Sequence, residues 1–324
     1  MGTPETLSPK KEAGHLYEEL LRQLKRQPAL RVEMILAKML MADRTLGTAE
    51  KLTQIDQLKG WLDGFRPLSA SILSELKQRY DVRFTYDSNA IEGNTLSLSE
   101  TELILSKGIT VGGKTLTEHL EVVGHKEAID YIETLSRSKA VISEWEIRQI
   151  HSLIMRKMSP VEAGRYRQLD VKAAGTGHVY PPHYQLPVLM SEFAEWLSVT
   201  QSTVHPIVFA SEAHYRFVSI HPFADGNGRT GRLLMNLLLL RAGFPIAVVP
   251  SQQRLAYIES LVQAQQSEGD LTALLDLVCQ ATYEALIETL SVVASAADSK
   301  GTGLAFYQDM LTFLEAQKSQ TNID

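Results

Sequence analysis

The chain has 324 residues, and 32 Lys and Arg against 38 Asp and Glu give a formal net charge of −6 at pH 7. Hydrophobic residues make up 44% and charged residues 22%, which excludes a disordered chain because the apolar fraction can bury a sizeable core. Without a basic excess, binding to duplex nucleic acid along the whole chain is not expected. The length fits about two domains, or one domain with extensions.

Cysteine content and hydropathy indicate the compartment. The single cysteine, Cys279, lies in an apolar helical run, so we expect a buried thiol in a reducing environment. The N-terminal segment has no apolar stretch after its charges, so no signal peptide is predicted. The longest apolar stretch, residues 233–250, is broken by Gly243 and Pro245 and is too short to span a bilayer. We therefore expect a cytoplasmic protein with no membrane partner.

Helical spacing of apolar residues dominates the chain, and the predicted fold is mainly α. In chain order, the spacing predicts helices over 15–42 (divided by Pro28), 46–86 (with a turn at 64–67), 97–108 and 117–136. A further helix is predicted to begin at Ser143, where Glu146 follows at the spacing of a capping box. The remaining helices are expected over 185–199, 206–220, 229–241, 252–266 and 270–297. Residues 164–184 differ, because β-prone residues flank AAGTG before two prolines, which predicts a short hairpin.

The segment HPFADGNGRTGR, residues 221–232, lies between two apolar helices and carries residue types suited to phosphate chemistry. Pro222 should turn His221 out of the preceding helix. Gly226 and Gly228 are expected to adopt positive φ, so that backbone amides can approach an anion. The helix predicted to begin near Arg229 would point its free N–H groups at the same place.

Charged side chains of this loop complete the expected phosphate site. Arg229 and Arg232 are three residues apart, hence neighbours on one helix face. Asp225 is the one carboxylate of the loop, and beside bound phosphates it is suited to hold Mg²⁺. The pattern HxFx[DE]GNGRxxR would arise by chance with a probability on the order of 10⁻⁸, so it is specific.

The eight specified positions of this loop match the signature of Fic (Fido-fold) proteins, and the chain resembles that family from about residue 76 to residue 290. The resemblance implies transfer of AMP from ATP to a Tyr, Thr or Ser hydroxyl of a target protein, and of the protein itself, with release of pyrophosphate. It implies that His221 is the general base, that Asp225 is the Mg²⁺ ligand and that Phe223 packs the loop. It further implies that ATP is bound by Gly226, Asn227, Gly228, Arg229, Thr230, Gly231, Arg232, Tyr257, Gln265 and Gly177.

The resemblance also implies a domain organisation and a target site. An N-terminal helical region (1–75) and helices with an inhibitory motif (76–140) would precede the Fido core (141–290) and a C-terminal helix and tail (291–324). The hairpin at 170–182 is similar to the family's flap, which pairs with an extended segment of the target protein. Tyr257 would stack near adenine. Ile258 and Gln265 depart from one well-known pattern of the family, which leaves the base preference open.

A second motif, upstream, predicts that the site is held inactive. Helical spacing through Val82 and Tyr86 ends at Gly93, so Glu92 is expected in the last turn of a helix, where a carboxylate is disfavoured by ~0.3–1 kcal/mol. Residues 88–93, SNAIEG, resemble the inhibitory motif [ST]xxxE[GN] of the same family. The resemblance implies an inhibitory role for Glu92 and Ser88, in which the Glu92 carboxylate pairs with Arg232 and competes with the γ-phosphate of ATP.

Other functions stay open at the level of sequence. Removal of AMP could use the same residues, with Glu92 orienting a water. A non-catalytic interaction or DNA-binding regulator with a vestigial site is the alternative from another class, although every polar position of the loop is intact. A homodimer is also left open, and nucleic acid is not an expected partner.

Overall fold

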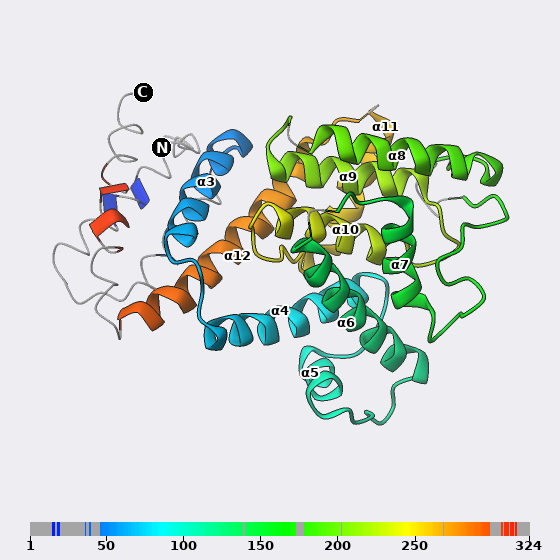
Figure 1. Cartoon of the computed structure of the whole chain (residues 1–324), viewed down its shortest axis with the longest axis horizontal. Coiled ribbons are helices and arrows are strands. Elements are labelled where there is room, and N and C mark those ends of the chain that lie inside the picture. The colour runs from blue at the N-terminus through cyan, green and yellow to red at the C-terminus, as the bar shows by residue number, and fades with distance from the viewer. Residues whose placement is uncertain are drawn as a thin grey trace, which may run out of the picture. The chain divides into compact units, whose positions relative to one another are not determined.

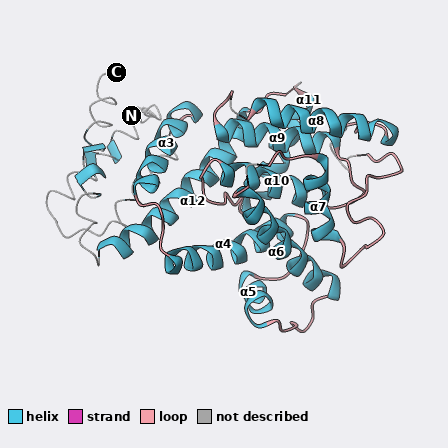
Figure 2. Ribbon diagram, in the orientation of Figure 1, coloured by secondary structure: helices cyan, strands magenta, loops and turns pink. Residues whose placement is uncertain are grey.

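The computed structural model of the chain is mainly helical (Figures 1 and 2). The structure describes residues 46–138, 140–172, 178–201, 203–267 and 269–298, together with scattered residues near both ends: 15, 16, 18, 19, 36, 39, 306, 308–310, 312, 313 and 315. The predicted helices within 15–42 therefore lie almost entirely outside the described residues.

Two compact units make up the chain, one formed by residues 1–76 with 279–324 and the other by residues 77–278. Their division falls within α4 (Ala70–Ile91) and within α12 (Thr272–Asp298). The boundary predicted after residue 75 lies one residue from that division. The boundary predicted after residue 140 does not separate units, because α6 (Leu116–Ser136) and α7 (Glu144–Met155) pack against each other in the second.

The second unit is built around α9 (Pro206–Ile220) and α10 (Asn227–Arg241), which lie side by side (Figure 1). Nearly every residue of α10 from Arg229 to Leu239 is buried, since α6 and α7 pack on it as well as α9. The remaining elements of this unit include α5 (Leu98–Lys107), α8 (Leu186–Thr200) and α11 (Arg254–Gln266), with one-turn 3₁₀ helices at His183–Gln185 and Ser251–Gln253. The central helix is therefore fixed from several sides.

Local sequence explains where these helices begin. The capping box predicted at Ser143 and Glu146 is present, and α5 and α6 begin with the same arrangement. Each box satisfies backbone N–H groups that a helix start leaves free. The helix predicted from Arg229 begins two residues earlier, at Asn227, because Gly226 supplies its left-handed cap.

In the first unit, α3 (Thr48–Gly64) presents Trp61 to the aromatic rings of Phe306 and Phe313, at centroid distances of 5.5 and 5.3 Å. The Tyr283 hydroxyl of α12 lies 3.3 Å from Gln54 Oε1. Cys279 is buried, as expected. Of the described helices, α12 contains a stretch, Thr272–Ala294, that is long and apolar enough to cross a membrane. Its 18-residue apolar window is 67% buried within the protein, as in a core helix.

The segment predicted as a hairpin is the least helical part of the chain. In the described residues, strand pairing is limited to an isolated antiparallel bridge between Lys172 and Val179. The bridge joins the two sides of the flap, which we define as residues 168–172 and 178–183. Residues 173–177, including Gly177 with its predicted role in ATP binding, lie outside the described residues.

Candidate active site

The loop between α9 and α10 is a tight connection with a left-handed residue at each end. His221 caps α9 at φ 52° and ψ 57°, and its N–H donates to Phe217 O at 3.0 Å. It is the one non-glycine with positive φ among the described residues. Gly226 closes the loop at φ 77° and caps α10. Such a backbone conformation is costly for a residue with a Cβ, and residues of this kind cluster at functional sites.

The His221 imidazole is half enclosed by the flap. Its ring stacks on Tyr180 with centroids 4.0 Å apart, and Nδ1 lies 3.4 Å from Val218 O. Burial lowers the pKa of His221 to about 4, so the ring is neutral at pH 7. A neutral imidazole whose Nδ1–H faces a carbonyl keeps the lone pair of Nε2 available as a base.

The first turn of α10 forms the anion-binding end of the loop. The first hydrogen bond of its ladder runs from Thr230 N–H to Gly226 O at 2.9 Å. The N–H groups of residues 227–229 precede that bond, so they have no partner within the helix. Gly228, predicted to have positive φ, is helical instead. Its lack of a Cβ has another reason, because a Cβ there would collide with Glu92 Oε1.

Asn227 and His151 hold the shape of the loop. The Asn227 side chain accepts from Phe223 N–H at 3.0 Å and donates to Phe223 O at 2.8 Å. Phe223 is fully buried, as predicted, and stacks on the His151 ring with centroids 3.6 Å apart. His151 Nδ1 accepts from Gly164 N–H at 2.9 Å, so its Nε2–H donates to Asp225 O at 3.0 Å. The Asn227 side chain, which is 3% exposed, thus holds the loop, and phosphate binding at this residue stays a prediction.

Asp225 points its carboxylate out of the loop. The side chain is 71% exposed, and Oδ1 accepts from Gly226 N–H at 2.6 Å. Its other oxygen, Oδ2, lies 3.4 Å from Arg229 Nη2. No group of three or more His, Cys, Asp or Glu suited to a metal occurs among the described residues. Asp225 could therefore hold a cation only together with ligands that another molecule supplies.

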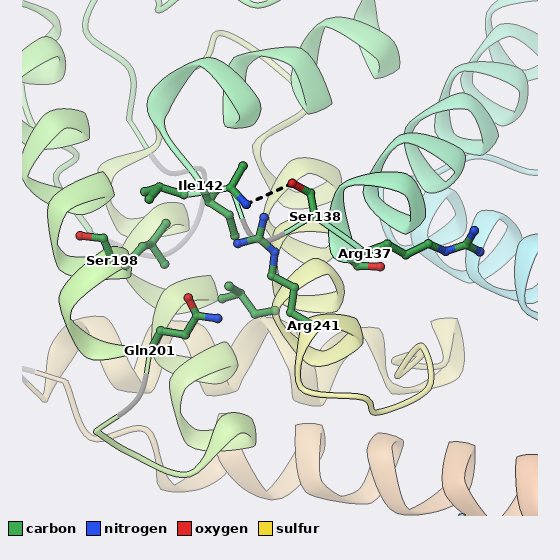
Figure 3. Close-up of a pocket in the computed structure, with 11 residues that line it drawn as sticks. Arg137, Ser138, Ile142, Ser198, Gln201 and Arg241 are labelled. Atoms are coloured by element: carbon green, nitrogen blue, oxygen red, sulfur yellow. Dashed lines mark hydrogen bonds between the residues drawn. The ribbon is translucent and has the colours of Figure 1, made fainter. Parts of the chain in front are cut away.

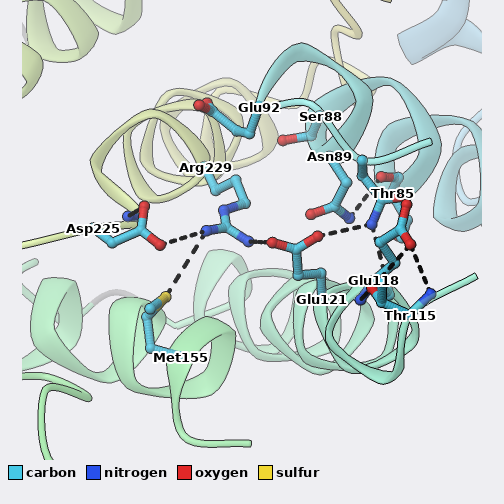
Figure 4. A network of polar contacts seen from close by, with 12 residues as sticks. Thr85, Ser88, Asn89, Glu92, Thr115, Glu118, Glu121, Met155, Asp225 and Arg229 are labelled. Carbon is cyan, nitrogen blue, oxygen red and sulfur yellow. Dashed lines mark hydrogen bonds and ion pairs between the residues drawn. The ribbon is translucent and has the colours of Figure 1, made fainter. Parts of the chain in front are cut away.

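Arg229 is buried between two carboxylates (Figure 4). Its Nη1 donates to Glu121 Oε1 at 3.1 Å, and Nη2 lies between Asp225 and Met155 Sδ. Glu121 comes from α6, and its other oxygen accepts from Asn94 Nδ2 at 2.8 Å. Sequence reasoning missed Glu121, because nothing near it in the chain resembles the loop that it contacts.

Arg232 is 2% exposed and surrounded by acceptors. Nε donates to Ser88 Oγ at 3.0 Å, and Nη2 donates to Ser88 O and to Glu92 Oε1, both at 2.7 Å. Glu92 lies in the turn directly after α4, and Arg232 holds its pKa below the usual value although burial acts in the opposite direction. The ion pair predicted between Glu92 and Arg232 is thus present, and Ser88, which belongs to the same predicted motif, also binds Arg232. Inhibition by this pair stays a prediction.

Comparison with known proteins agrees with this geometry. Residues 141–239 match the family model described as Fic/DOC family. Curated relatives named Protein adenylyltransferase Fic include one from Drosophila grimshawi, 37% identical over 73% of this chain, and one from Culex quinquefasciatus, 38% identical over 75%. This chain belongs to the Fic/DOC family.

Solved Fic structures share the fold. Fic-1 from C. elegans is 28% identical, with a TM-score of 0.69 over 90% of each chain. A Fic domain containing signaling protein from Bacteroides thetaiotaomicron is 29% identical, with a TM-score of 0.66 over 75% of this chain and 97% of that one. The chain spans about half the length of the curated relatives, 48% and 49% in the two named above.

Several residues predicted to contact ATP are buried in the Fic core. Tyr257 is 2% exposed, and its hydroxyl lies 2.7 Å from His214 Nε2 and 3.3 Å from Arg232 Nη1. The buried ring supports Arg232 in this structure, and its stacking near adenine stays a prediction. Thr230 and Gly231 are likewise buried on the inner side of α10, and a Cβ at Gly231 would lie 2.8 Å from His214 Nδ1. They pack the helix and offer no side chain to a ligand.

A cavity of about 320 Å³ adjoins the Fic loop next to the flap. It is lined by Pro181, Leu189, Glu192, Phe193, Trp196, Tyr215, Arg216, Ser219 and Ile220. Ile220 directly precedes His221, so the cavity opens beside the loop. Gln265, another predicted ATP contact, donates from Nε2 to Ser219 Oγ at 3.3 Å and is thereby held at this cavity. Its contact with ATP stays a prediction.

A second cavity, of about 410 Å³, lies at the other end of α10 (Figure 3). It is lined by Arg241 and by the ends of α6 and α8, including Ser136 and Gln201. Three helix C-termini meet there, and their partial negative charge opposes an anionic ligand. None of the predicted site residues lines it, so the chemistry belongs to the Fic loop.

Proposed function

We propose that this chain is a protein adenylyltransferase that transfers AMP from ATP to a hydroxyl side chain. The observation that carries the proposal is the convergence, in one loop, of a neutral His221 and the free first turn of α10, flanked by two buried arginines. The curated relatives that bear this activity in their names support it.

In the proposed reaction, His221 Nε2 removes the proton from the target hydroxyl as its oxygen attacks the α-phosphorus of ATP. A new oxygen–phosphorus bond forms, the bond from the α-phosphorus to the bridging oxygen breaks, and pyrophosphate leaves with the electron pair. His221 holds the proton until it is released to solvent. The low pKa keeps His221 unprotonated, and thus ready, throughout the neutral pH range.

The first turn of α10 is suited to bind the phosphates. The backbone N–H groups of residues 227–229 and the positive end of the helix attract their charge. Gly226 and Gly228 let the backbone approach closely, and Arg229 and Arg232 supply guanidinium groups on the same side of α10. Arg232 would bind the γ-phosphate once it is released by Glu92.

A divalent cation, Mg²⁺, fits the exposed carboxylate of Asp225. Mg²⁺ binds one or two carboxylates together with phosphate oxygens, and Asp225 is the carboxylate at the open side of the loop. When bound, the ion would neutralise charge on the phosphates. Asp225 itself would hold the ion, while its backbone carbonyl stays tied to His151 Nε2–H.

Glu92 keeps the site inactive in this proposal. Its carboxylate lies against Gly228 and pairs with Arg232 at 2.7 Å, where it competes with a phosphate for the same guanidinium. ATP bound beside an intact pair would lack one anchor, so its α-phosphate would be out of line with the attacking oxygen. Removal of AMP is the second candidate, since the Glu92 side chain is 37% exposed and could orient a water at the same phosphorus.

A target protein would bind as an extended segment along the flap. The bridge from Lys172 to Val179 marks a short two-stranded element, and such an element can accept a further strand through main-chain hydrogen bonds. The cavity beside Ile220 and Gln265 is suited to the nucleotide base, because it is largely apolar and joins the loop. A second copy of this chain is one partner to test, since self-modification requires no other protein.

The proposal is tested by incubating the full chain carrying Glu92→Gly with Mg²⁺ and ATP labelled at either the α- or the γ-phosphate. We expect label on the protein from α-labelled ATP and none from γ-labelled ATP. His221→Ala in the same background should lower the rate by at least ~10²-fold, which is the usual contribution of a general base. Transfer of γ-label would indicate a kinase, and undiminished α-label in folded His221→Ala would contradict the role of His221.

A further inference from the structure

Arg167 lies between the flap and the Fic loop, and its buried guanidinium binds carbonyls of three segments. Nε donates to His221 O at 2.9 Å, Nη1 to Leu169 O at 2.9 Å and Nη2 to Pro181 O at 2.5 Å. The side chain is 1% exposed. Its backbone N–H adds a fourth contact, to Pro222 O at 3.0 Å. One residue thus binds both sides of the flap and the two residues that open the Fic loop.

These carbonyls belong to the parts that must be aligned for transfer. Leu169 and Pro181 lie on the two sides of the flap, beyond the bridge between Lys172 and Val179. Next to Pro181, Tyr180 stacks on the His221 ring. The three hydrogen bonds therefore fix the flap with respect to the imidazole, and not merely one strand with respect to the other.

The contact at His221 acts on a strained peptide. His221 has left-handed backbone geometry, which costs on the order of 1–3 kcal/mol for such a residue and must be enforced by its surroundings. Arg167 binds the carbonyl of His221 and, through its own N–H, the carbonyl of Pro222. Both peptides that follow the strained Cα are thereby held in one orientation, and the direction of the imidazole depends on them.

Pairing with a carboxylate does not explain why an arginine is buried at position 167. The nearest carboxylate oxygen, Asp170 Oδ1, is 3.8 Å away, and that side chain is 65% exposed and hydrogen-bonded to His183. Burial lowers the pKa of Arg167, against the attraction of Asp170. A planar guanidinium can reach three carbonyls in different directions, whereas a lysine ammonium presents its donors from a single point.

We propose that Arg167 is a positioning residue. It holds the flap at a fixed distance from the His221 ring and so aligns the target hydroxyl with Nε2 of His221. This inference rests on the AMP transfer proposed above. Arg167 touches no reacting atom in this account. Its loss should lower the rate of the chemical step more than the binding of ATP, because Arg167 contacts neither the first turn of α10 nor the arginines proposed to bind the phosphates.

The test compares Arg167→Met and Arg167→Lys with a control, Arg148→Met, all in full-length protein carrying Glu92→Gly. Arg148 is a suitable control because its Nε donates to a carbonyl of the same segment, Gly164 O at 2.7 Å, but reaches neither the flap nor His221. Two quantities are measured, namely hydrogen exchange of the flap amides without nucleotide, and the kcat and ATP KM of self-labelling.

We expect Arg167→Met to raise flap exchange and lower kcat, each by at least ~10-fold, because it removes three hydrogen bonds to buried carbonyls. The ATP KM should stay within about threefold, since ground-state binding of ATP is separate from alignment. Arg148→Met should change neither quantity. Arg167→Lys keeps the positive charge and should retain only part of the kcat. If Arg167→Met does not fold, both quantities are measured on Arg167→Lys instead.

Unchanged flap exchange in the folded Arg167 variants would overturn the proposal, and so would full recovery with lysine. A rise in ATP KM that accounts for the lost rate would also overturn it, because the residue would then serve nucleotide binding. Absence of label in the Glu92→Gly parent would refute AMP transfer and with it the alignment role. In that case the exchange data would still show whether Arg167 holds the flap.

Discussion

Replacing Glu92 by glycine should strengthen the binding of ATP much more than that of ADP. The pair to Arg232 is a charge-assisted hydrogen bond of 2.7 Å, and such bonds contribute about 1.5–3 kcal/mol. The Glu92 side chain is 37% exposed, which places the value toward the lower end. About 1.4–2 kcal/mol corresponds to a 10- to 30-fold gain in the affinity of a ligand that uses Arg232. ADP lacks the γ-phosphate assigned to this guanidinium, so its gain should stay below about threefold.

Isothermal titration of wild type and Glu92→Gly with ATP and ADP, at matched Mg²⁺, measures both affinities. Glu92→Gln serves as a control for charge, because it keeps the side-chain volume near Gly228 and should give an intermediate gain. Glycine at this position is tolerable for the backbone, since α4 ends at Ile91 and residue 92 lies in the following turn. Equal gains for ATP and ADP would refute the reasoning, because the released group would then not be the one that binds the γ-phosphate.

Three further predictions follow from burial around the loop. The rate of transfer should be nearly independent of pH from about 6 to 8 and should fall as the pH drops through about 4. The reason is that the base must be unprotonated and the pKa of His221 is about 4. A pH–rate profile with a fall near 6.5 would contradict this. Tyr257→Phe removes the hydroxyl that contacts both Arg232 and His214, and should lower the free energy of unfolding in urea by about 1–3 kcal/mol. Gly231→Ala should lower it by a similar ~1–3 kcal/mol, since the new Cβ would lie 2.8 Å from His214 Nδ1, and a stability equal to wild type would show that the core yields there.

Local sequence was sufficient to predict most of the described helices and the position of the loop between α9 and α10. Capping boxes and apolar periodicity depend on neighbours within a few residues, and so the start of α7 at Ser143 was predictable. The pairing of Glu92 with Arg232, 140 positions apart, was found only through a resemblance to a known motif. Nothing in the residues alone joins those two positions.

The residues that sequence reasoning missed act through packing. His151, Glu121 and Arg167 contact the loop across 74, 108 and 54 positions of the chain, and each is an ordinary residue in its own segment. The roles of His151 and Glu121 depend on how α6 and α7 pack on α10, and that of Arg167 on how the segment after α7 meets the loop. No local pattern contains either. Tyr257 is a similar case, because its assignment to adenine came from a resemblance, whereas the burial of its ring depends on packing.

We propose that Glu92 restrains AMP transfer through Arg232, and initial rates of labelling from α-labelled ATP in four proteins test this restraint. The four are wild type, Glu92→Gly, Arg232→Ala and the double variant. If the uninhibited state is about 1% populated in wild type, Glu92→Gly should raise the rate by up to ~100-fold. We expect the double variant to lose this gain, because the released arginine aligns the triphosphate. A double variant as fast as Glu92→Gly would contradict it.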